Sequence, residues 1–338
     1  SKGSGSVGAA VSVAGGGLGA YEVVLGSGQP DLVACDSRTS TEWFFPTGST
    51  GSGSSEWITL FNPLRTPAVA DLSFITEAGP SAPGQFQGIV IKPRTEVSES
   101  LDVYVAQQPA IATEVTVTSG RLVAAESELA PKLGLEVAQG YASLSHQVVF
   151  APTSASSTSL TLVNPGQITA HAEVLASGAV MSRDLVVPPQ SIQSLPVQAT
   201  TPGPVEVDTQ AGTLMAALSW PSAVLGYSPG MVRPSSHWLV AEAAGSVSVV
   251  NPGRQEVRLL SGVSPEGSGT VAPHSEGVLL APAKGMGGQS SPTAELVELS
   301  APAFLVLSPS TNTRKATLSN RRQASAANLA DLPPLPSS

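Results

Sequence analysis

The sequence predicts an all-β protein made of three tandem antiparallel β-sandwich modules, immunoglobulin-like or jelly-roll-like. Three observations predict this fold class. A strand that ends in Asn-Pro recurs three times, the segments around it recur in the same order, and 33 Gly and 29 Pro are spread along the whole chain as turn signals. The 338 residues are also too many for one ordinary core, since domains average about 100–200 residues.

The recurring strand occupies residues 56–63, 158–165 and 245–252. Its apolar residues alternate with small polar ones, which is the period of a half-buried strand. Pro cannot donate to a β-ladder, and an Asn side chain can bond the backbone two residues on, so Asn-Pro ends the strand and begins a turn. We therefore interpret the following residues as structural repeat markers: Asn62, Pro63, Asn164, Pro165, Asn251 and Pro252.

The neighbouring segments support a repeat rather than a chance match. An apolar strand precedes each marker, at 43–46, 149–152 and 237–240, and a short strand closing on Pro follows at 89–93, 185–189 and 270–273. The Asn markers stand at 62, 164 and 251, so they are 102 and 87 residues apart. That length fits a sandwich of six to eight short strands, whereas a propeller blade spans only about 40–45 residues.

These landmarks give a division of the chain. We expect a leader or N-terminal anchor at 1–35, sandwich repeats at 36–128, 145–228 and 229–312, a connector at 129–144, and a basic then Pro/Ala/Ser-rich disordered tail at 313–338. The Ala, Glu and Leu content of residues 124–135 indicates a short helical connector or loop that Pro131 interrupts.

The N-terminal segment leaves two hypotheses open. Residues 3–21 carry no charge, and their 19 residues approach the roughly 20 that span a bilayer. Seven of the 19 are Gly, which weakens the apolar driving force. The segment is therefore either a degenerate membrane anchor or export remnant, or a flexible leader outside the folded core.

Composition excludes several functions. Charged residues make up only 12% of the chain, and the net charge of -9 argues against nucleic-acid binding, which needs clustered Lys and Arg. We interpret the one basic cluster, at 314–322, as a solvated tail segment. Cys35 is the only cysteine, so neither an intrachain disulfide nor a thiolate metal cluster can form. A polar, acidic chain of this kind is typical of an exported protein.

Motifs that resemble catalytic sites fail on inspection. Residues 226–230 match G-x-S-x-G, but Pro229 lacks the backbone N–H that an oxyanion hole needs, so we interpret Ser228 as a turn residue. The Gly/Ser-rich loop at 47–55 lacks the Lys of a phosphate-binding loop and is interpreted as a flexible hairpin connection. We therefore expect no catalytic, metal-binding or cofactor-binding residue.

Histidine, tryptophan and carboxylate patterns give no site either. The four histidines show no metal-ligand spacing, and Trp43 and Trp238 occupy equivalent strand positions that favour core packing. Glu96, Glu99 and Asp102 lie on an exposed polar run rather than on two sides of a cleft, as a glycosidase requires.

The residues Trp43-Phe-Phe-Pro-Thr-Gly-Ser-Thr-Gly-Ser-Gly53, followed by Leu60-Phe-Asn-Pro63, carry a family resemblance. They resemble an uncharacterised family of actinobacterial exported proteins with repeats written W-Y/F-F-x-x-G-x-T-G-x-G and L-x-L-x-N-P. A more distant likeness is to the small β-sandwich transducer of sensory rhodopsins. The resemblance implies an extracytoplasmic location and no defined activity, and the third copy departs from it by losing the glycine-rich loop.

We expect a non-enzymatic binding or scaffolding protein, secreted or anchored in the bacterial cell envelope. Its expected partner is an envelope protein or a glycan, with no cofactor, no nucleic acid, and membrane association only through the N-terminal segment. Two alternatives stay open: a carbohydrate-binding accessory module or carbohydrate-active enzyme, and a purely structural spacer.

Overall fold

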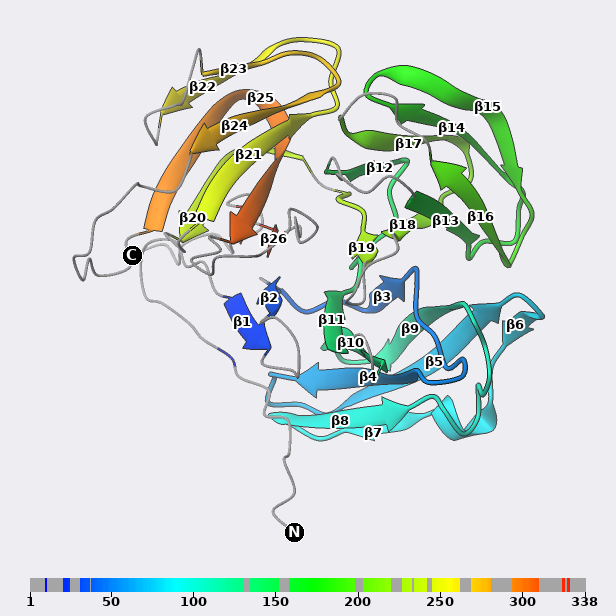
Figure 1. The fold of residues 1–338 in the computed structure, drawn as a ribbon. Helices are drawn as coiled ribbons and strands as arrows, with labels where there is room; N and C mark the ends of the chain where they lie inside the picture. The colour runs from blue at the N-terminus through cyan, green and yellow to red at the C-terminus, as the bar shows by residue number, and fades with distance from the viewer. Residues whose placement is uncertain are drawn as a thin grey trace.

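The protein is described from a computed structural model. The structure describes residues 10, 21–24, 31–36, 38–130, 134–151, 158–197, 203–219, 227–232, 234–241, 245–261, 269–280, 294–309, 324–325 and 327–328. Over these ranges the chain is built of antiparallel strands, with one helical turn, η1 (Gly84–Phe86), which confirms the all-β fold class (Figure 1). None of the helical structure in these ranges has the length and hydropathy to cross a membrane.

The first sheet pair contains the first Asn-Pro strand. One sheet has the order β3-β9-β5-β6, with β7 also paired to β5, and the other has the order β11-β10-β4-β8. The strands are β3 (Glu42–Phe45), β4 (Ser55–Asn62), β5 (Ala68–Thr76), β6 (Gly79–Ser81), β7 (Ile89–Ile91), β8 (Thr95–Ser100), β9 (Ile111–Ser119), β10 (Val123–Ala130) and β11 (Gly134–Gln139).

The second sheet pair repeats this arrangement. Its sheets have the orders β12-β17-β14-β15 and β16-β13-β18-β19. The strands are β12 (Gln147–Phe150), β13 (Thr158–Asn164), β14 (Ala170–Ala176), β15 (Ala179–Val187), β16 (Ser191–Val197), β17 (Val205–Ala211), β18 (Met215–Ser219) and β19 (Tyr227–Pro229).

The third sheet pair follows the same order with one difference, because the long strand β25 belongs to both sheets. Its first part pairs with β20 and β22, and its second part pairs with β21 and β26. The strands are β20 (Ser235–Ala241), β21 (Gly245–Asn251), β22 (Val257–Ser261), β23 (Thr270–Val271), β24 (Ser275–Leu280), β25 (Ala294–Pro309), β26 (Ala324–Ser325) and β27 (Ala327–Asn328).

Each sheet pair encloses its own apolar core. The inward residues of the Asn-Pro strands, such as Ile58, Leu160 and Val249, are fully buried in three separate clusters. Trp43 and Trp238 lie in the first and third cores, as their equivalent sequence positions predicted. Their indole N–H groups donate to the carbonyl oxygens of Leu122 at 3.1 Å and Ser235 at 2.9 Å, so both rings are satisfied inside the core.

The helical interpretation of residues 124–135 is wrong, because β10 and β11 run through it. Ala124, Glu126, Glu128 and Ala130 are buried at every second position, which is a strand period despite the helix-favouring composition. The expected connector at 129–144 therefore contains the end of β10 and the whole of β11, which pairs with β10 as the outermost strand of its sheet.

Short strands lie in both of the regions expected at the ends of the chain. The region expected as a disordered tail contains β26 and β27. β26 pairs with β25 and β27 pairs with β20, at backbone groups of β25 and β20 that are free to accept another strand. Within the expected leader, β1 (Tyr21–Val24) and β2 (Asp31–Ala34) form a two-stranded sheet, and β2 contacts β11 and β26. The basic cluster at 314–322 and the uncharged segment at 3–21, apart from Ala10 and Tyr21, lie outside the described residues.

The Asn of each Asn-Pro strand ties the two sheets of its pair together. Asn62 lies at the end of β4 and is fully buried. Its side-chain nitrogen donates to the Thr66 carbonyl at 2.8 Å and, in the facing sheet, to the Ile91 carbonyl at the end of β7 at 3.1 Å. Its side-chain oxygen accepts from the Leu64 N–H at 3.0 Å, which is the Asx turn that the sequence predicted.

The other two markers make the same bonds, and we call this arrangement the Asn clamp. Asn164 bonds Ile168 O at 2.8 Å, Val187 O at 2.9 Å and Gly166 N at 2.9 Å, and Asn251 bonds Gln255 O at 2.8 Å, Val271 O at 3.1 Å and Gly253 N at 2.9 Å.

The carbonyl that receives the clamp lies next to a repeated proline turn. After Ile91, the chain turns at Lys92-Pro93-Arg94-Thr95, where Arg94 has φ 57° and the Thr95 hydroxyl donates to Lys92 O at 2.9 Å. A positive φ after proline is the geometry of a type II turn. The equivalent turns have Gln190 and His274 at φ 48°, with Ser191 donating to Pro188 O at 2.8 Å and Ser275 to Ala272 O at 2.7 Å.

We expect Asn164→Ala to lower the free energy of unfolding by at least about 2 kcal/mol. The backbone groups that hydrogen-bond to the Asn164 side chain would stay buried without that partner. Equilibrium urea unfolding followed by far-UV circular dichroism measures this loss. Thr161→Ala is the matched control on the same strand, since its hydroxyl bond to Ser194 is exposed, and it should change stability by less than about 0.5 kcal/mol. Equal effects of the two substitutions would contradict a special role for the clamp.

Candidate functional site

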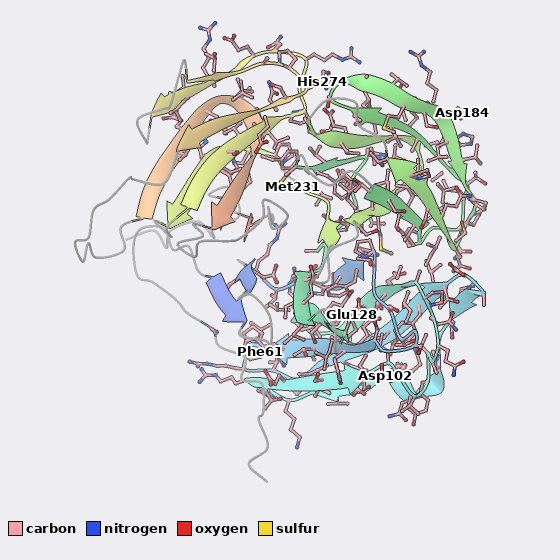
Figure 2. All side chains as sticks on the ribbon, viewed as in Figure 1. Phe61, Asp102, Glu128, Asp184, Met231 and His274 are labelled. Carbon is pink, nitrogen blue, oxygen red and sulfur yellow. The ribbon has the colours of Figure 1, made fainter. Side chains whose placement is uncertain are left out.

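The most unusual chemical feature of the structure is a row of buried carboxyl groups in the first sheet pair. Glu128 of β10 lies directly opposite Glu56 of β4 on one side and Glu136 of β11 on the other. All three residues are buried, as is Glu126 two positions before Glu128. We call these four residues the acidic row; Figure 2 labels Glu128 and the nearby Asp102.

The alternation of the strands places the acidic row on the inner face of the sheet. Glu56 continues the inward series of Ile58, Leu60 and Asn62, and Glu126 and Glu128 continue that of Ala124. Four carboxyl groups therefore extend the apolar core toward one end of the sandwich. Period-two reading of residues 124–130 would have found this row, but the helix-favouring composition concealed it.

Two loops cover this end of the sheet pair. The Gly/Ser-rich loop before β4 and the loop before β9 bond through Thr50 N to Gln108 O at 3.0 Å and Gln107 N to Thr50 O at 3.1 Å. The Thr50 hydroxyl also donates to the Val105 carbonyl. The expectation of a flexible connection at 47–55 is therefore wrong, because the loop is paired with its neighbour and Gly48 and Thr50 are buried.

Gly48 explains part of the glycine content of this loop. A Cβ atom at position 48 would lie 2.3 Å from a carboxylate oxygen of Glu56, so any other residue there would have to displace the Glu56 carboxyl group. The loop backbone thus packs directly on the Glu56 carboxyl group. Asp102 adds a second link, because its Oδ1 accepts from the Glu56 backbone N–H at 3.1 Å.

Burial dominates the electrostatics of the acidic row. Both side-chain oxygens of Glu56 are buried without a hydrogen bond of normal geometry, and the nearby Ser49 backbone only partly opposes the rise in pKa that burial causes. Burial raises the pKa of Glu56 well above its ordinary value, and the negative charges of Glu126, Glu128 and Asp102 raise it further. Burial also raises the pKa of Glu128, against a smaller opposing effect of the Ser54 hydroxyl.

The burial of the acidic row favours the neutral form of Glu56 and keeps its carboxyl group away from solvent. Glu56 is 0% exposed, so a reacting molecule has no access to its carboxyl group. Among the residues that the structure describes, no group of His, Cys, Asp and Glu has an arrangement that could hold a metal ion. The chemistry open to the acidic row is therefore a change of protonation that alters the stability of the sheets and loops around it.

The other residues considered as sites are not brought together. Ser228 lies in β19 opposite Leu218, so it is a strand residue and not the turn residue expected. His171 bonds Asp184 at 2.7 Å on the second sheet pair, and His237 lies 3.6 Å from Glu298 on the third. The three Asn markers lie in three different cores, and Glu96 and Glu99 lie half-buried in β8 rather than fully exposed.

One histidine connects two sheet pairs. His274 Nδ1 lies 2.9 Å from a carboxylate oxygen of Glu206, which is fully buried on β17. Burial raises the pKa of Glu206, and the bond to His274 partly opposes that rise. His274 lies where the second and third sheet pairs approach each other (Figure 2), and its bond to Glu206 adds a polar contact between them.

Comparison with known proteins gives a family and no activity. A family model described only as a family of unknown function, DUF5719, matches residues 32–278, which is more than half of the chain. The chain belongs to DUF5719. The match includes all three Asn clamps and the whole acidic row. No curated protein and no solved structure matches the chain.

For this DUF5719 chain, we expect Glu56→Gln to raise the free energy of unfolding at about pH 8 by at least about 1 kcal/mol, the energy of a tenfold change in a protonation equilibrium. The pKa of Glu56 is raised in the folded state, so its contribution to stability is present below its unfolded pKa and lost as pH rises through its folded pKa. The gain should therefore shrink at about pH 4. Thermal unfolding across this pH range measures it.

The exposed Glu77→Gln substitution is the control for Glu56→Gln, because it removes one carboxylate from the same sheet pair without changing a buried group. It should have little effect at either pH. A Glu56→Gln gain of equal size at both pH values would contradict the assignment of a raised pKa.

Proposed function

We propose that the chain is a non-enzymatic binding or scaffolding protein of the bacterial cell envelope, acting outside the cytoplasm. The observation that carries this proposal is the packing of neighbouring sheet pairs through linker residues, of which Tyr141 is buried and Met231 is half-buried. A scaffold must hold its binding surfaces at fixed positions, and a packed linker provides that rigidity.

The first junction is built around Tyr141, in the linker after β11. Tyr141 and Phe44 of β3 exchange two backbone hydrogen bonds, at 2.9 and 2.8 Å. The Tyr141 ring lies in a cluster with Val163 and Met215 of the second sheet pair, and its hydroxyl donates to Ala216 O at 2.7 Å. The linker is thus bonded to both sheet pairs at once.

The second junction repeats this design. Met231, in the linker after β19, exchanges backbone bonds with Val149 of β12 at 2.9 and 2.7 Å. It packs with a cluster that contains Val250 and Phe304 of the third sheet pair.

A glycine precedes each linker residue for the same reason. A Cβ atom at Gly140 would lie 2.8 Å from the Phe45 ring, and one at Gly230 would lie 2.0 Å from Val148. The backbone passes too close to the core to carry a side chain.

Composition and the sequence resemblance support the envelope location. The net charge of -9 argues against nucleic-acid binding, and a polar, acidic composition is typical of an exported protein. The resemblance to actinobacterial exported proteins points the same way. Surface loops between the strands are the expected recognition elements, as in other sandwich proteins.

The structure gives little support to the carbohydrate-active alternative. Trp43 and Trp238 are buried in cores and cannot stack on a sugar at the surface, which leaves Trp57, half-buried on β4, as the tryptophan among the described residues that is partly accessible. The acidic row lies beneath two loops and is not placed across a cleft. A purely structural spacer would use the same junctions, but it would tolerate substitutions throughout its loops.

The proposal is tested by capture of envelope proteins and glycans on the purified chain, together with fractionation of cells into cytoplasm, membrane and medium. We expect a specific protein or glycan to be retained. Tyr141→Ala should weaken capture, because loss of a buried aromatic ring costs about 3–5 kcal/mol and frees the first junction. Val186→Ala, which changes a half-exposed residue of strand β15 outside the loops and the junctions, is the control.

Two results would overturn the proposal. One is capture of neither protein nor glycan above background by a folded chain. The other is turnover of a polysaccharide that a single carboxylate substitution abolishes, which would favour the enzyme.

A further inference from the structure

The contact between His274 and Glu206 crosses the second junction. His274 belongs to the proline turn after β23 in the third sheet pair, and Glu206 belongs to β17 in the second. The Glu206 side chain is 0% exposed and the His274 side chain is 27% exposed. The ring Nδ1 atom lies 2.9 and 3.2 Å from the two carboxylate oxygens. A fully buried carboxyl group of one sheet pair therefore finds its side-chain partner in the next.

Two turns, one from each sheet pair, bring these residues together. His274 has φ 48° in its turn, and the turn between β14 and β15 packs against it. A Cβ atom at Gly178 in that turn would lie 3.0 Å from the His274 Cβ atom. The neighbouring Ser177 N–H donates to the Pro204 carbonyl at 2.8 Å, which ties the same turn to the start of β17. The position of the ring over Glu206 is thus fixed by backbone geometry on both sides.

The first junction has an equivalent acid without the histidine. Glu114 of β9 lies opposite the strand residue that bonds to the first linker, and Glu206 has the same position at the second linker. In the proline turns, Gln190 of the second sheet pair takes the place of His274. A glutamine side chain has no titratable group. Of the two junctions, the second therefore joins a buried carboxyl group to a partner whose charge changes with pH.

The charges around Glu206 determine how strong this contact is. Burial raises the pKa of Glu206, the bond to His274 and its charge oppose that rise, and the charge of Asp208 adds to it. The contribution of Glu206 to the junction is therefore complete below its ordinary pKa and falls as pH rises through its raised value. The other charged or titratable residues on the strands and turns beside the pair are Glu173, Arg183, His146 and Glu276.

A positive charge on the His274 ring offsets the cost of burying the ionised Glu206 carboxylate. Histidine side chains ordinarily lose their charge between about pH 5 and 8. In alkaline solution the carboxylate would therefore stay buried beside a neutral ring, which is the least favourable combination for a buried ion.

We propose that the contact between His274 and Glu206 is a pH-sensitive latch, which fixes the third sheet pair against the second in mildly acidic solution and loosens in alkaline solution. The apolar contacts of Met231 with Val250 and Phe304 do not titrate. The third sheet pair therefore moves about its linker when the latch loosens, and each sheet pair keeps its own core.

The latch acts on a junction that the proposed scaffolding role needs for rigidity. It is tested on purified protein alone, so its failure is distinct from a failure to capture an envelope partner.

The test measures distances between two spin labels by double electron–electron resonance, at about pH 6 and about pH 9, below and above the usual pKa of histidine. Labels on Ile168→Cys and Leu260→Cys, which replace exposed residues, report on the second junction. Labels on Val90→Cys and Ile168→Cys report on the first junction and serve as the matched control. All proteins carry Cys35→Ser, so that the exposed Cys35 takes no label.

We expect the distance distribution across the second junction to broaden from the lower to the higher pH, with little change across the first. His274→Gln should give the broad distribution at both pH values, because Glu206 then ionises without a positive partner. Glu206→Gln should give the narrow distribution at both, since its amide oxygen can still accept from the ring and carries no buried charge. His171→Gln is the control variant and should behave as the parent, because the partner of His171 is Asp184 in the same sheet pair.

Three results would overturn the proposal. The distribution across the second junction could be the same at both pH values, or the first junction could broaden as much as the second. Either latch variant, shown by circular dichroism to be folded, could also keep the pH response of the parent. The first two results come from the parent chain, so they decide the matter even where a variant does not fold.

Discussion

The buried carboxamide of each Asn clamp is the contact on which the rest of the structure depends. A sandwich has two sheets that share no backbone hydrogen bonds, so apolar packing alone would leave their relative position soft. The clamp adds a directional bond between the sheets, from Asn62 to Ile91, from Asn164 to Val187 and from Asn251 to Val271. It also satisfies buried carbonyl groups that would otherwise cost about 1–3 kcal/mol each.

The clamp also determines which residue faces the junction, because successive side chains of a strand point to opposite faces. Once the Asn side chain is held inward, the residue before it must face outward. That residue is Phe61, Val163 or Val250, and the last two are the ones that bury themselves against the preceding sheet pair. The clamp Asn thus bonds inside its sheet pair, and the residue directly before it packs outward against the preceding sheet pair. Two adjacent residues therefore connect the interior of a sheet pair to its junction. The acidic row has the opposite effect on stability. Burial raises the pKa of Glu56, so its ionised form destabilises the folded state.

The sequence could predict the clamp only in part. Period-two alternation and Asn-Pro located the strand ends and the Asx turns, because both are local in the chain. The same reading found the strands that close on Pro, yet it could not show that Asn62 meets Ile91, since 29 residues separate them. The acidic row was missed for a different reason: composition in residues 124–135 favoured helix, and the pairing of β10 with β4 outweighed that preference. The packed linkers likewise depend on contacts between sheet pairs, which no local pattern records.

Native-state hydrogen exchange on Asn62→Asp tests the central claim most directly. Asp keeps an oxygen that can accept from Leu64 N, but an ionised carboxylate cannot donate to Thr66 and Ile91 and instead repels their carbonyl oxygens, so the bonds made by the side-chain nitrogen are replaced by repulsion. The clamp predicts that amides of β4 and of β5, in the two facing sheets, lose protection together, while β13 and β14 keep theirs. Loss of protection confined to the turn after Asn62, with both sheets unchanged, would contradict the claim that the clamp holds the sheets together.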